Sequence, residues 1–296
     1  MRIGKHTITS VLAPMAGYTD IAFRTLCREY GAGLTVTEMV SVRGLAHDSQ
    51  KTALLMRLSD KESPSCIQLF GNDPKDFAAA AKAIACDIID INMGCPMPKI
   101  VKNGDGAALL NNPVLAGQIV RAIKDVTDKP VTVKTRLGYR VGEEQAAALI
   151  ESVAKAGASA VTVHGRYAEQ RYAGVSDSNA VMEIAKASPI PIILNGDVCD
   201  MPVLKPPIAA YMIGRYALSN PRVFEGEQAT PFATARRHMQ LLVEYFDERY
   251  TINQARKFFV HYVRGVNGGK ALRAAVNTAQ TVSDVLFALD ECEKIN

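Results

Sequence analysis

The stretch with the clearest chemical potential is Asp-Ile-Asn-Met-Gly-Cys-Pro, residues 90–96. Asp90 and Asn92 alternate with apolar residues, so in an extended strand their side chains share one face. Cys95 follows between a glycine and a proline, on the loop that leaves this strand. A lone cysteine is more often a buried structural thiol. The position of Cys95 at a strand end nevertheless favours a chemical role.

Two later apolar runs end in cations. Lys134 and Arg136 are two residues apart and point the same way, and the same holds for His164 and Arg166. Buried cations are costly unless they meet an anion. A structural ion pair is one explanation of this pattern. The gathering of four such residues favours a site for an anion or an electron-rich ring.

Glycine-containing turns follow the last two apolar runs, at Asn195-Gly196-Asp197 and at Gly214-Arg215. In a barrel of alternating strands and helices, the loops after strands seven and eight are the usual phosphate site. Glycines let backbone N–H groups approach a phosphate, and an arginine or a helix N-terminus adds positive charge. The two turns therefore predict a phosphate site.

Further polar and small residues complete the predicted site. Gln68 is an amide within an apolar run, where it needs a hydrogen-bond partner such as a ring edge or a core group. Pro14, Met15 and Ala16 precede Gly17 and permit close approach of a flat ligand, although an ordinary tight turn has the same composition. A phosphate site, a lysine facing a ring and a cysteine on the opposite rim fit FMN better than a nicotinamide or pyridoxal phosphate.

The elements that must position these residues are short runs rich in Val and Ile, typical of buried parallel strands. Amphipathic helices separate most of them, for example at 74–85, 113–126 and 143–156. Eight strand–helix units predict an α/β fold, a (β/α)8 TIM barrel, rather than a doubly wound open sheet. Prolines at 202, 206 and 207 predict a short turn of helix or a loop before the last strand. The strands are expected at 11–15, 34–39, 65–70, 88–93, 131–137, 160–164, 191–195 and 211–213.

Strand signals stop near residue 230, and helices are expected at 230–249, 253–266, 269–277 and 282–292. The sequence therefore predicts a catalytic barrel over 1–228 and a small all-α domain over 229–296. Residues 232–273 hold eight basic and three acidic side chains, a net charge of +5 against +4 for the whole chain. A solvated helical face has such a composition, but we favour a surface that binds the RNA backbone.

Composition narrows the class of protein. Hydrophobic residues make up 48% of the 296 residues, enough for a large core. The six cysteines form no C-x-x-C pair and no Cys/His cluster with zinc spacing, so we expect no metal and a reducing, cytoplasmic setting. No signal peptide and no membrane span are expected, because long apolar runs are missing.

Together these motifs resemble the tRNA-dihydrouridine synthase family, and within it the bacterial B-type branch. The resemblance covers the predicted barrel almost completely and continues more weakly into the tail. The stretch Asn-x-Gly-Cys-Pro at the end of a fourth strand is its most specific part. The matching stretches are 13–20, 23–24, 37–39, 90–96, 133–138, 163–166, 195–197 and 212–215.

The resemblance implies an FMN-bound barrel with a helical tRNA-binding domain and NADPH or NADH as the reductant. It implies that hydride passes from flavin N5 to C6 of a uracil in the tRNA D-loop, while Cys95 protonates C5. The residues implied for the cofactor are Pro14, Met15, Ala16, Gln68, Lys134, His164, Asn195, Gly196, Asp197, Gly214 and Arg215. Those implied or expected for tRNA are Asn92, Arg136, Arg166, Arg256 and Lys257.

Two other functions share parts of this pattern. A small-molecule FMN oxidoreductase has the same phosphate site but leaves the basic tail unexplained. A tRNA-binding or tRNA-folding protein on the same scaffold leaves the combination of Cys95 and Lys134 unexplained. We expect a monomer, because tRNA needs open access to the barrel mouth.

Overall fold

The computed structural model describes residues 1–45, 50–228 and 230–296. The chain opens with an antiparallel hairpin of β1 (Arg2–Ile3) and β2 (His6–Thr7). Among the described residues, no helix has both the length and the apolar character needed to cross a bilayer.

Parallel strands follow and close into a barrel, which confirms the predicted fold and excludes the open sheet. The order is β4-β3-β11-β10-β9-β8-β7-β6, and pairing of Thr35 with Ser65 joins β4 to β6 and closes the ring. A short β5 (Val40–Ser41) lies beside the carboxyl end of β6. The barrel strands are β3 (Ser10–Leu12), β4 (Leu34–Val36), β6 (Ser65–Phe70), β7 (Ile88–Asn92), β8 (Val131–Arg136), β9 (Ala160–His164), β10 (Ile192–Asn195) and β11 (Ile208–Ile213).

Helices surround the barrel, and several begin where the sequence provides a cap. Asp73 accepts the Lys75 amide at 2.8 Å, and Asn112 accepts the Leu115 amide at 3.1 Å, with a proline at the first helical position each time. The connection over 196–207 is a loop, as its prolines predicted. The helices are α1 (Ile21–Glu29), α2 (Val42–Leu45), α3 (Gln50–Leu55), α4 (Pro74–Ala83), α5 (Pro98–Val101), α6 (Pro113–Lys124), α7 (Ala146–Lys155), α8 (Ser178–Ala187) and α9 (Arg215–Ser219), with 3₁₀ turns η1 (Gly106–Asn111) and η2 (Pro221–Glu225).

Four further helices form the C-terminal part: α10 (Pro231–Tyr245), α11 (Glu248–Tyr262), α12 (Gly269–Thr278) and α13 (Val282–Glu293). The helix expected over 230–249 is present but ends earlier, and the helix expected over 253–266 begins at Glu248. The chain leaves the helix at Phe246, and Asp247 caps the next one by accepting the Tyr250 amide at 2.8 Å. No glycine or proline marks this break. The predicted domain boundary falls at residue 229, outside the described residues.

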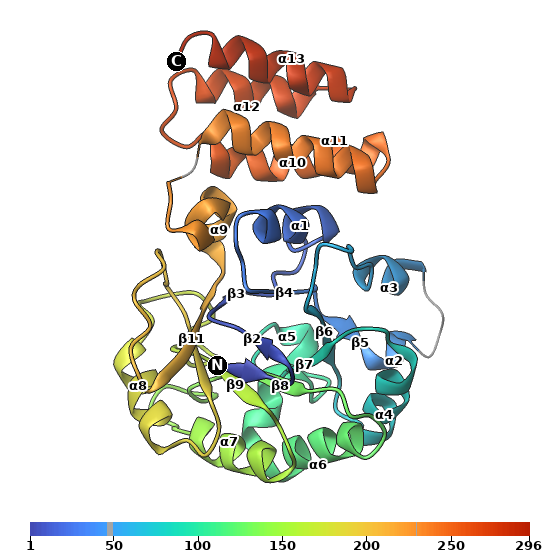
Figure 1. Cartoon of the computed structure of the whole chain (residues 1–296), viewed down its shortest axis with the longest axis vertical. Helices are drawn as coiled ribbons and strands as arrows, with labels where there is room; N and C mark the ends of the chain where they lie inside the picture. The colour runs from blue at the N-terminus through green and yellow to red at the C-terminus, as the bar shows by residue number, and fades with distance from the viewer. Residues whose placement is uncertain (46–49, 229) are drawn as a thin grey trace.

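The C-terminal helices stack beside α1 and α9 (Figure 1). A single buried apolar cluster joins them, with Phe23 from α1, Leu218 from α9, Leu242 from α10 and Phe258 from α11. An ion pair lies nearby. Arg24 Nε is 2.8 Å from Glu62 Oε2, both side chains are almost fully buried, and Arg24 also donates to the carbonyl oxygens of Thr19 and Arg57.

We predict that Glu62→Leu lowers the free energy of unfolding by about 3–5 kcal/mol, because it leaves the Arg24 guanidinium buried without its anion. The double variant Arg24→Met/Glu62→Leu should recover most of that loss. Urea denaturation measures both. Glu151→Gln, which breaks an exposed ion pair with Lys155, is the control and should leave the midpoint almost unchanged. A Glu62→Leu midpoint equal to that of the control would contradict the prediction.

Candidate active site

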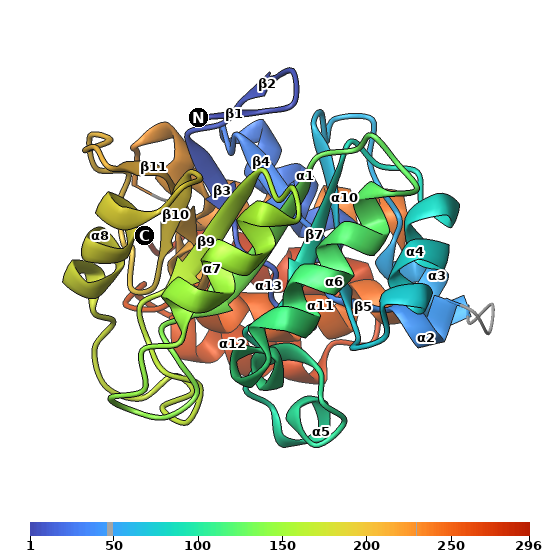
Figure 2. The same ribbon diagram turned by 90° about the horizontal axis from the view of Figure 1, so that it is seen from below.

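The carboxyl ends of the barrel strands lie at the end marked by α5, opposite the β1–β2 hairpin (Figure 2). Parallel register brings the predicted side chains together there. Asn92 pairs with Lys134 across β7 and β8, and Arg136 pairs with His164 across β8 and β9. His164 in turn pairs with Asn195 across β9 and β10. Residues that are 28 to 42 positions apart in the sequence thus become neighbours at one edge.

A buried chain of hydrogen bonds connects three of the polar side chains. Asp90 accepts Gln68 Nε2 at 2.7 Å and Thr132 Oγ1 at 2.6 Å. Gln68 Oε1 then accepts Asn92 Nδ2 at 2.9 Å. Burial raises the pKa of Asp90, against the hydrogen bonds from Thr132 and Gln68, which lower it. The two predicted amides are therefore oriented by a carboxyl group that was not itself assigned a role.

Cys95 lies half-buried on the loop after β7. Asn92 Oδ1 accepts its amide at 2.9 Å, and its carbonyl accepts the Ala107 amide at 3.1 Å, so the backbone on both sides of the thiol is held. Burial raises the pKa of the thiol, although the amide of Met97 and the charges of Arg136 and Lys134 oppose this. The group is a thiol at neutral pH and can donate a proton.

Lys134 lies beside this loop. Its pKa is lowered to about 8, mainly by burial and then by the nearby Arg136. Within the part of the chain that the structure describes, its Nζ donates no hydrogen bond. A half-buried ammonium without an acceptor is costly and fits a site that an electron-rich group occupies.

The predicted phosphate side carries its own counter-charge. Asp197 accepts Arg166 at 2.5 Å and Arg215 at 2.9 Å. Burial raises its pKa, but hydrogen bonds from Arg166 and the Ser176 amide outweigh this and hold it below its ordinary value. His164 contacts Arg166, and burial together with four neighbouring cations lowers its pKa to about 2. His164 is therefore a neutral imidazole.

The turns on this side are shaped by glycine. Gly196 has φ of +114°, and a Cβ there would lie 2.8 Å from His164 Cδ2 and collide with the Ser176 hydroxyl. Asn195 Nδ2 donates to the carbonyl of Met212 at 2.8 Å, which joins β10 to β11 beside the Gly214 turn. These features agree with a backbone cradle for a phosphate.

The loop after β3 forms the neighbouring wall. It closes through the Met15 carbonyl, which accepts the amides of Tyr18 at 2.9 Å and Thr19 at 3.0 Å. Pro14 and Met15 are partly exposed, and Ala16 is exposed. A Cβ added to Gly214 would lie 3.8 Å from Met15 Sδ, so this loop and the Gly214 turn face each other.

All five residues assigned to tRNA direct donors into the protein. Asn92 donates to Gln68, and the buried Arg166 donates to Asp197 and to the carbonyls of Ala173 and Gly174. Arg136 is buried and donates to the carbonyls of Gly94, Tyr167 and Arg171 at 2.9–3.1 Å. Arg256 donates to the carbonyl of Ala279 at 2.8 Å, where α12 ends, and Lys257 donates to the carbonyl of Gly17. Their contact with RNA stays a prediction.

Sequence reasoning missed Tyr172, on the loop between β9 and α8. The residue is 55% exposed, and its ring centre lies within cation–π distance of two guanidinium groups, 5.8 Å from Arg136 and 5.3 Å from Arg215. An aromatic residue in a long loop gives no periodic signal. Its position after a strand that ends in His164 and Arg166 is the feature that points to it.

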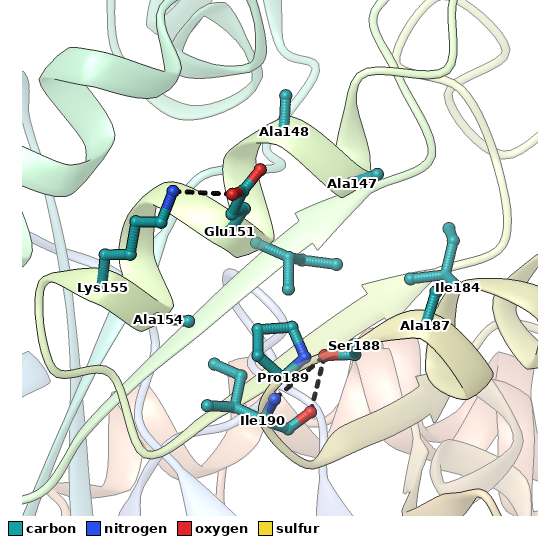
Figure 3. Close-up of a pocket in the computed structure, with 11 residues that line it drawn as sticks. Ala147, Ala148, Glu151, Ala154, Lys155, Ile184, Ala187, Ser188, Pro189 and Ile190 are labelled. Atoms are coloured by element: carbon teal, nitrogen blue, oxygen red, sulfur yellow. Dashed lines mark hydrogen bonds and ion pairs between the residues drawn. The ribbon is translucent and has the colours of Figure 1, made fainter.

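A groove of about 760 Å³ lies elsewhere, between α7 and α8 on the outside of the barrel (Figure 3). It is lined by alanine, isoleucine and Pro189, with the Lys155–Glu151 ion pair on its rim. Ser188 and Ile190 lie just before β10, so the groove is near the amino ends of the strands. It does not contain any residue of the candidate site.

Comparison with solved structures supports the fold. The chain superposes on a 2-naphthoyl-CoA reductase in complex with 2-naphthoyl-CoA with a TM-score of 0.60 and 10% identity, covering 76% of this chain and 51% of that one. It superposes on a variant of NCR from Zymomonas mobilis with a TM-score of 0.53 and 14% identity, covering 77% and 91%. At these identities the likeness establishes the barrel fold alone.

Comparison by sequence identifies the family. Residues 11–296 match the family model of dihydrouridine synthase (Dus). A tRNA-dihydrouridine synthase B of Proteus vulgaris is 34% identical, covering 98% of this chain and 97% of that protein. Another from Pseudomonas aeruginosa is 33% identical, covering 95% and 92%. The chain belongs to the dihydrouridine synthase family and is an oxidoreductase, as the resemblance of its motifs predicted.

At pH 8 without denaturant, iodoacetamide should modify the exposed Cys199 well before Cys95, because burial raises the pKa of the Cys95 thiol and the thiolate is the reactive form. Peptide mass spectrometry over a time course measures both rates. The variant Cys199→Ser removes the fast site and serves as the control. Faster labelling of Cys95 than of Cys199 would show an activated thiolate and contradict a role as proton donor.

Proposed function

We propose that this chain is an FMN-dependent, NAD(P)H-driven tRNA-dihydrouridine synthase that reduces the C5–C6 bond of uridines in the tRNA D-loop. The observation that carries the proposal is the position of the Cys95 thiol, on the loop after β7, near Lys134 on β8, whose ammonium has no hydrogen-bond acceptor among the described residues. The family assignment supports the substrate class. We propose further that the enzyme is a cytoplasmic monomer.

The residues present fit FMN. Lys134 supplies a cation to the polar edge of the ring, and Gln68 has a second amide hydrogen beyond the one that Asp90 accepts. The backbone of Pro14, Met15 and Ala16 offers a wall to its flat face. His164, Asn195, Gly196, Asp197, Gly214 and Arg215 would hold the ribityl chain and phosphate. When bound, FMN would supply the hydride that reduces uracil, and NADPH or NADH would return the flavin to its reduced form.

The remaining chemistry belongs to the protein. Cys95 delivers a proton to C5 of the uracil, the carbon next to the C6 that receives hydride. Asn92 orients the base, and its own amide is fixed by Gln68 and by the Cys95 amide. Tyr172 offers an exposed ring at the same edge, against which an extruded base or the flanking nucleotide can pack.

The helical domain offers a positive surface for the RNA backbone, smaller than the sequence indicated. Of its eight cations between 232 and 273, Arg236 and Arg237 form ion pairs with acidic side chains. Arg256 and Lys257 bond to main-chain carbonyls. The remaining four, which have no ion-pair partner among the described residues, are Arg249, Arg264, Lys270 and Arg273.

The purified protein should be yellow, and Cys95→Ala should keep the flavin absorbance while tRNA reduction slows by about 10²–10⁴-fold, the usual contribution of a general acid. Stopped-flow oxidation of the reduced enzyme by uridine-containing tRNA measures the rate. A protein that stays colourless after FMN is added and unbound flavin is removed would contradict the proposal. Equal reduction of free uridine and tRNA would indicate a small-molecule oxidoreductase instead.

The double variant Arg264→Gln/Lys270→Gln should weaken tRNA binding and reduce the slope of log K against log salt by about 2, since each lost phosphate contact removes about one unit. The matched control is Lys155→Gln/Lys186→Gln, which removes the same charge from the far side of the barrel. Filter binding over a salt series measures both. Equal salt slopes for the two double variants would indicate that these helical-domain cations do not contact the RNA backbone.

A further inference from the structure

The loop that follows β3 is held by the helical domain as well as by the barrel. Gly17 lies at its tip with φ of +79°. Its amide donates to Glu38 Oε2 at 2.5 Å, a residue that follows β4 in the barrel. Its carbonyl accepts Lys257 Nζ from α11. Both main-chain polar groups of this glycine are therefore bonded to charged side chains, one from each domain.

The contact extends over one face of α11. Lys257 Nζ lies 5.2 Å from the centre of the Tyr18 ring, a cation–π distance. Phe258 packs edge-on against the same ring with centroids 5.6 Å apart, and His261 lies at 6.0 Å. Lys257 and Phe258 both lie next to His261 on the surface of α11, because they precede it by four and three positions. These three side chains contact the ring of Tyr18, the residue after Gly17.

A second contact holds the other end of the loop. Tyr250, at the start of α11, donates its hydroxyl to Asp20 Oδ2 at 3.2 Å, and Asp20 caps α1 by accepting the Phe23 amide at 2.9 Å. Helix α11 also packs against α9, which begins directly after the Gly214 turn. The helix therefore contacts the β3 loop and the helix that follows the β11 turn, the two segments next to the proposed cofactor site.

These contacts give Lys257 a different setting from the exposed cations of its domain. Its side chain is partly buried, and its ammonium is committed to a carbonyl and an aromatic face. A charge-assisted hydrogen bond of this kind is about twice as strong as a neutral one. Lys270, in contrast, is exposed on α12 and has no partner among the described residues.

We propose that Lys257 is a positioning residue for the cofactor: it holds the β3 loop, and with it the backbone of Pro14, Met15 and Ala16, in the form that receives FMN. The helical domain is then a part of the flavin site as well as an RNA-binding module. This rests on the proposed function, since it takes FMN as the ligand. If the loop is already ordered before FMN binds, binding does not have to offset the conformational entropy lost on ordering it, and the affinity is higher.

The test is FMN affinity in the absence of tRNA, measured on full-length apo-protein by quenching of flavin fluorescence, with the visible circular dichroism of the bound flavin as a second readout. We expect Lys257→Met to weaken FMN binding at least tenfold and to alter the flavin spectrum. Lys257→Arg keeps a cationic donor and should bind within about threefold of the wild type. Lys270→Met should bind FMN as the wild type does and lose tRNA affinity instead.

The outcomes separate this inference from the proposed function. Wild-type protein that binds no FMN overturns both. If Lys257→Met binds FMN as tightly as the wild type but loses tRNA affinity, Lys257 is an RNA contact. That result overturns the inference and leaves the proposed function intact. If Lys257→Met does not fold, Glu38→Ala releases the same glycine from the barrel side and should weaken FMN binding in the same assay; unchanged binding there overturns the inference.

Discussion

The arrangement of the site depends on one buried carboxyl group, Asp90. A carboxylate can only accept hydrogen bonds, so the amide nitrogen of Gln68 must face it and the amide oxygen must face away. That oxygen takes the amide nitrogen of Asn92, whose oxygen is then free for the amides of Gly94 and Cys95. One acceptor in the barrel interior thereby sets two amide orientations and the path of the loop that carries the thiol.

Charge follows the same logic around the barrel edge. Parallel register places cations from β8 and from the segments after β9 and β11 close together. Burial and these cations lower the pKa of His164 to about 2. Asp197 compensates the two arginines on the phosphate side. Lys134 has no comparable partner among the described residues, so the positive potential is concentrated where the ring of the cofactor is expected. The position of the anionic partner Asp197, rather than the number of cations, makes the two sides of the site differ in charge.

The helical domain is joined to the barrel by a shared apolar core and by side chains that reach across it. Phe23 packs with Phe258 at a centroid distance of 4.8 Å, and the buried Arg24–Glu62 pair ties α1 to the segment before β6. Interfaces of this kind oppose independent domain motion. The surface proposed for RNA and the loops proposed for flavin are therefore held in one relative position, as a base extruded from tRNA onto a cofactor requires.

Burial periodicity, glycine turns and short motifs are local signals, so the barrel fold and the family could be predicted from the sequence, and the role of Cys95 stays a prediction. The sequence also indicated a basic helical tail. Only the tertiary structure decided where each cation points: Arg136 and Arg256 bond to distant carbonyls, and Lys257 bonds to Gly17. The break before Asp247 lacked a glycine or proline signal. Partner choice depends on residues brought together by folding, and no pattern along the chain encodes that proximity.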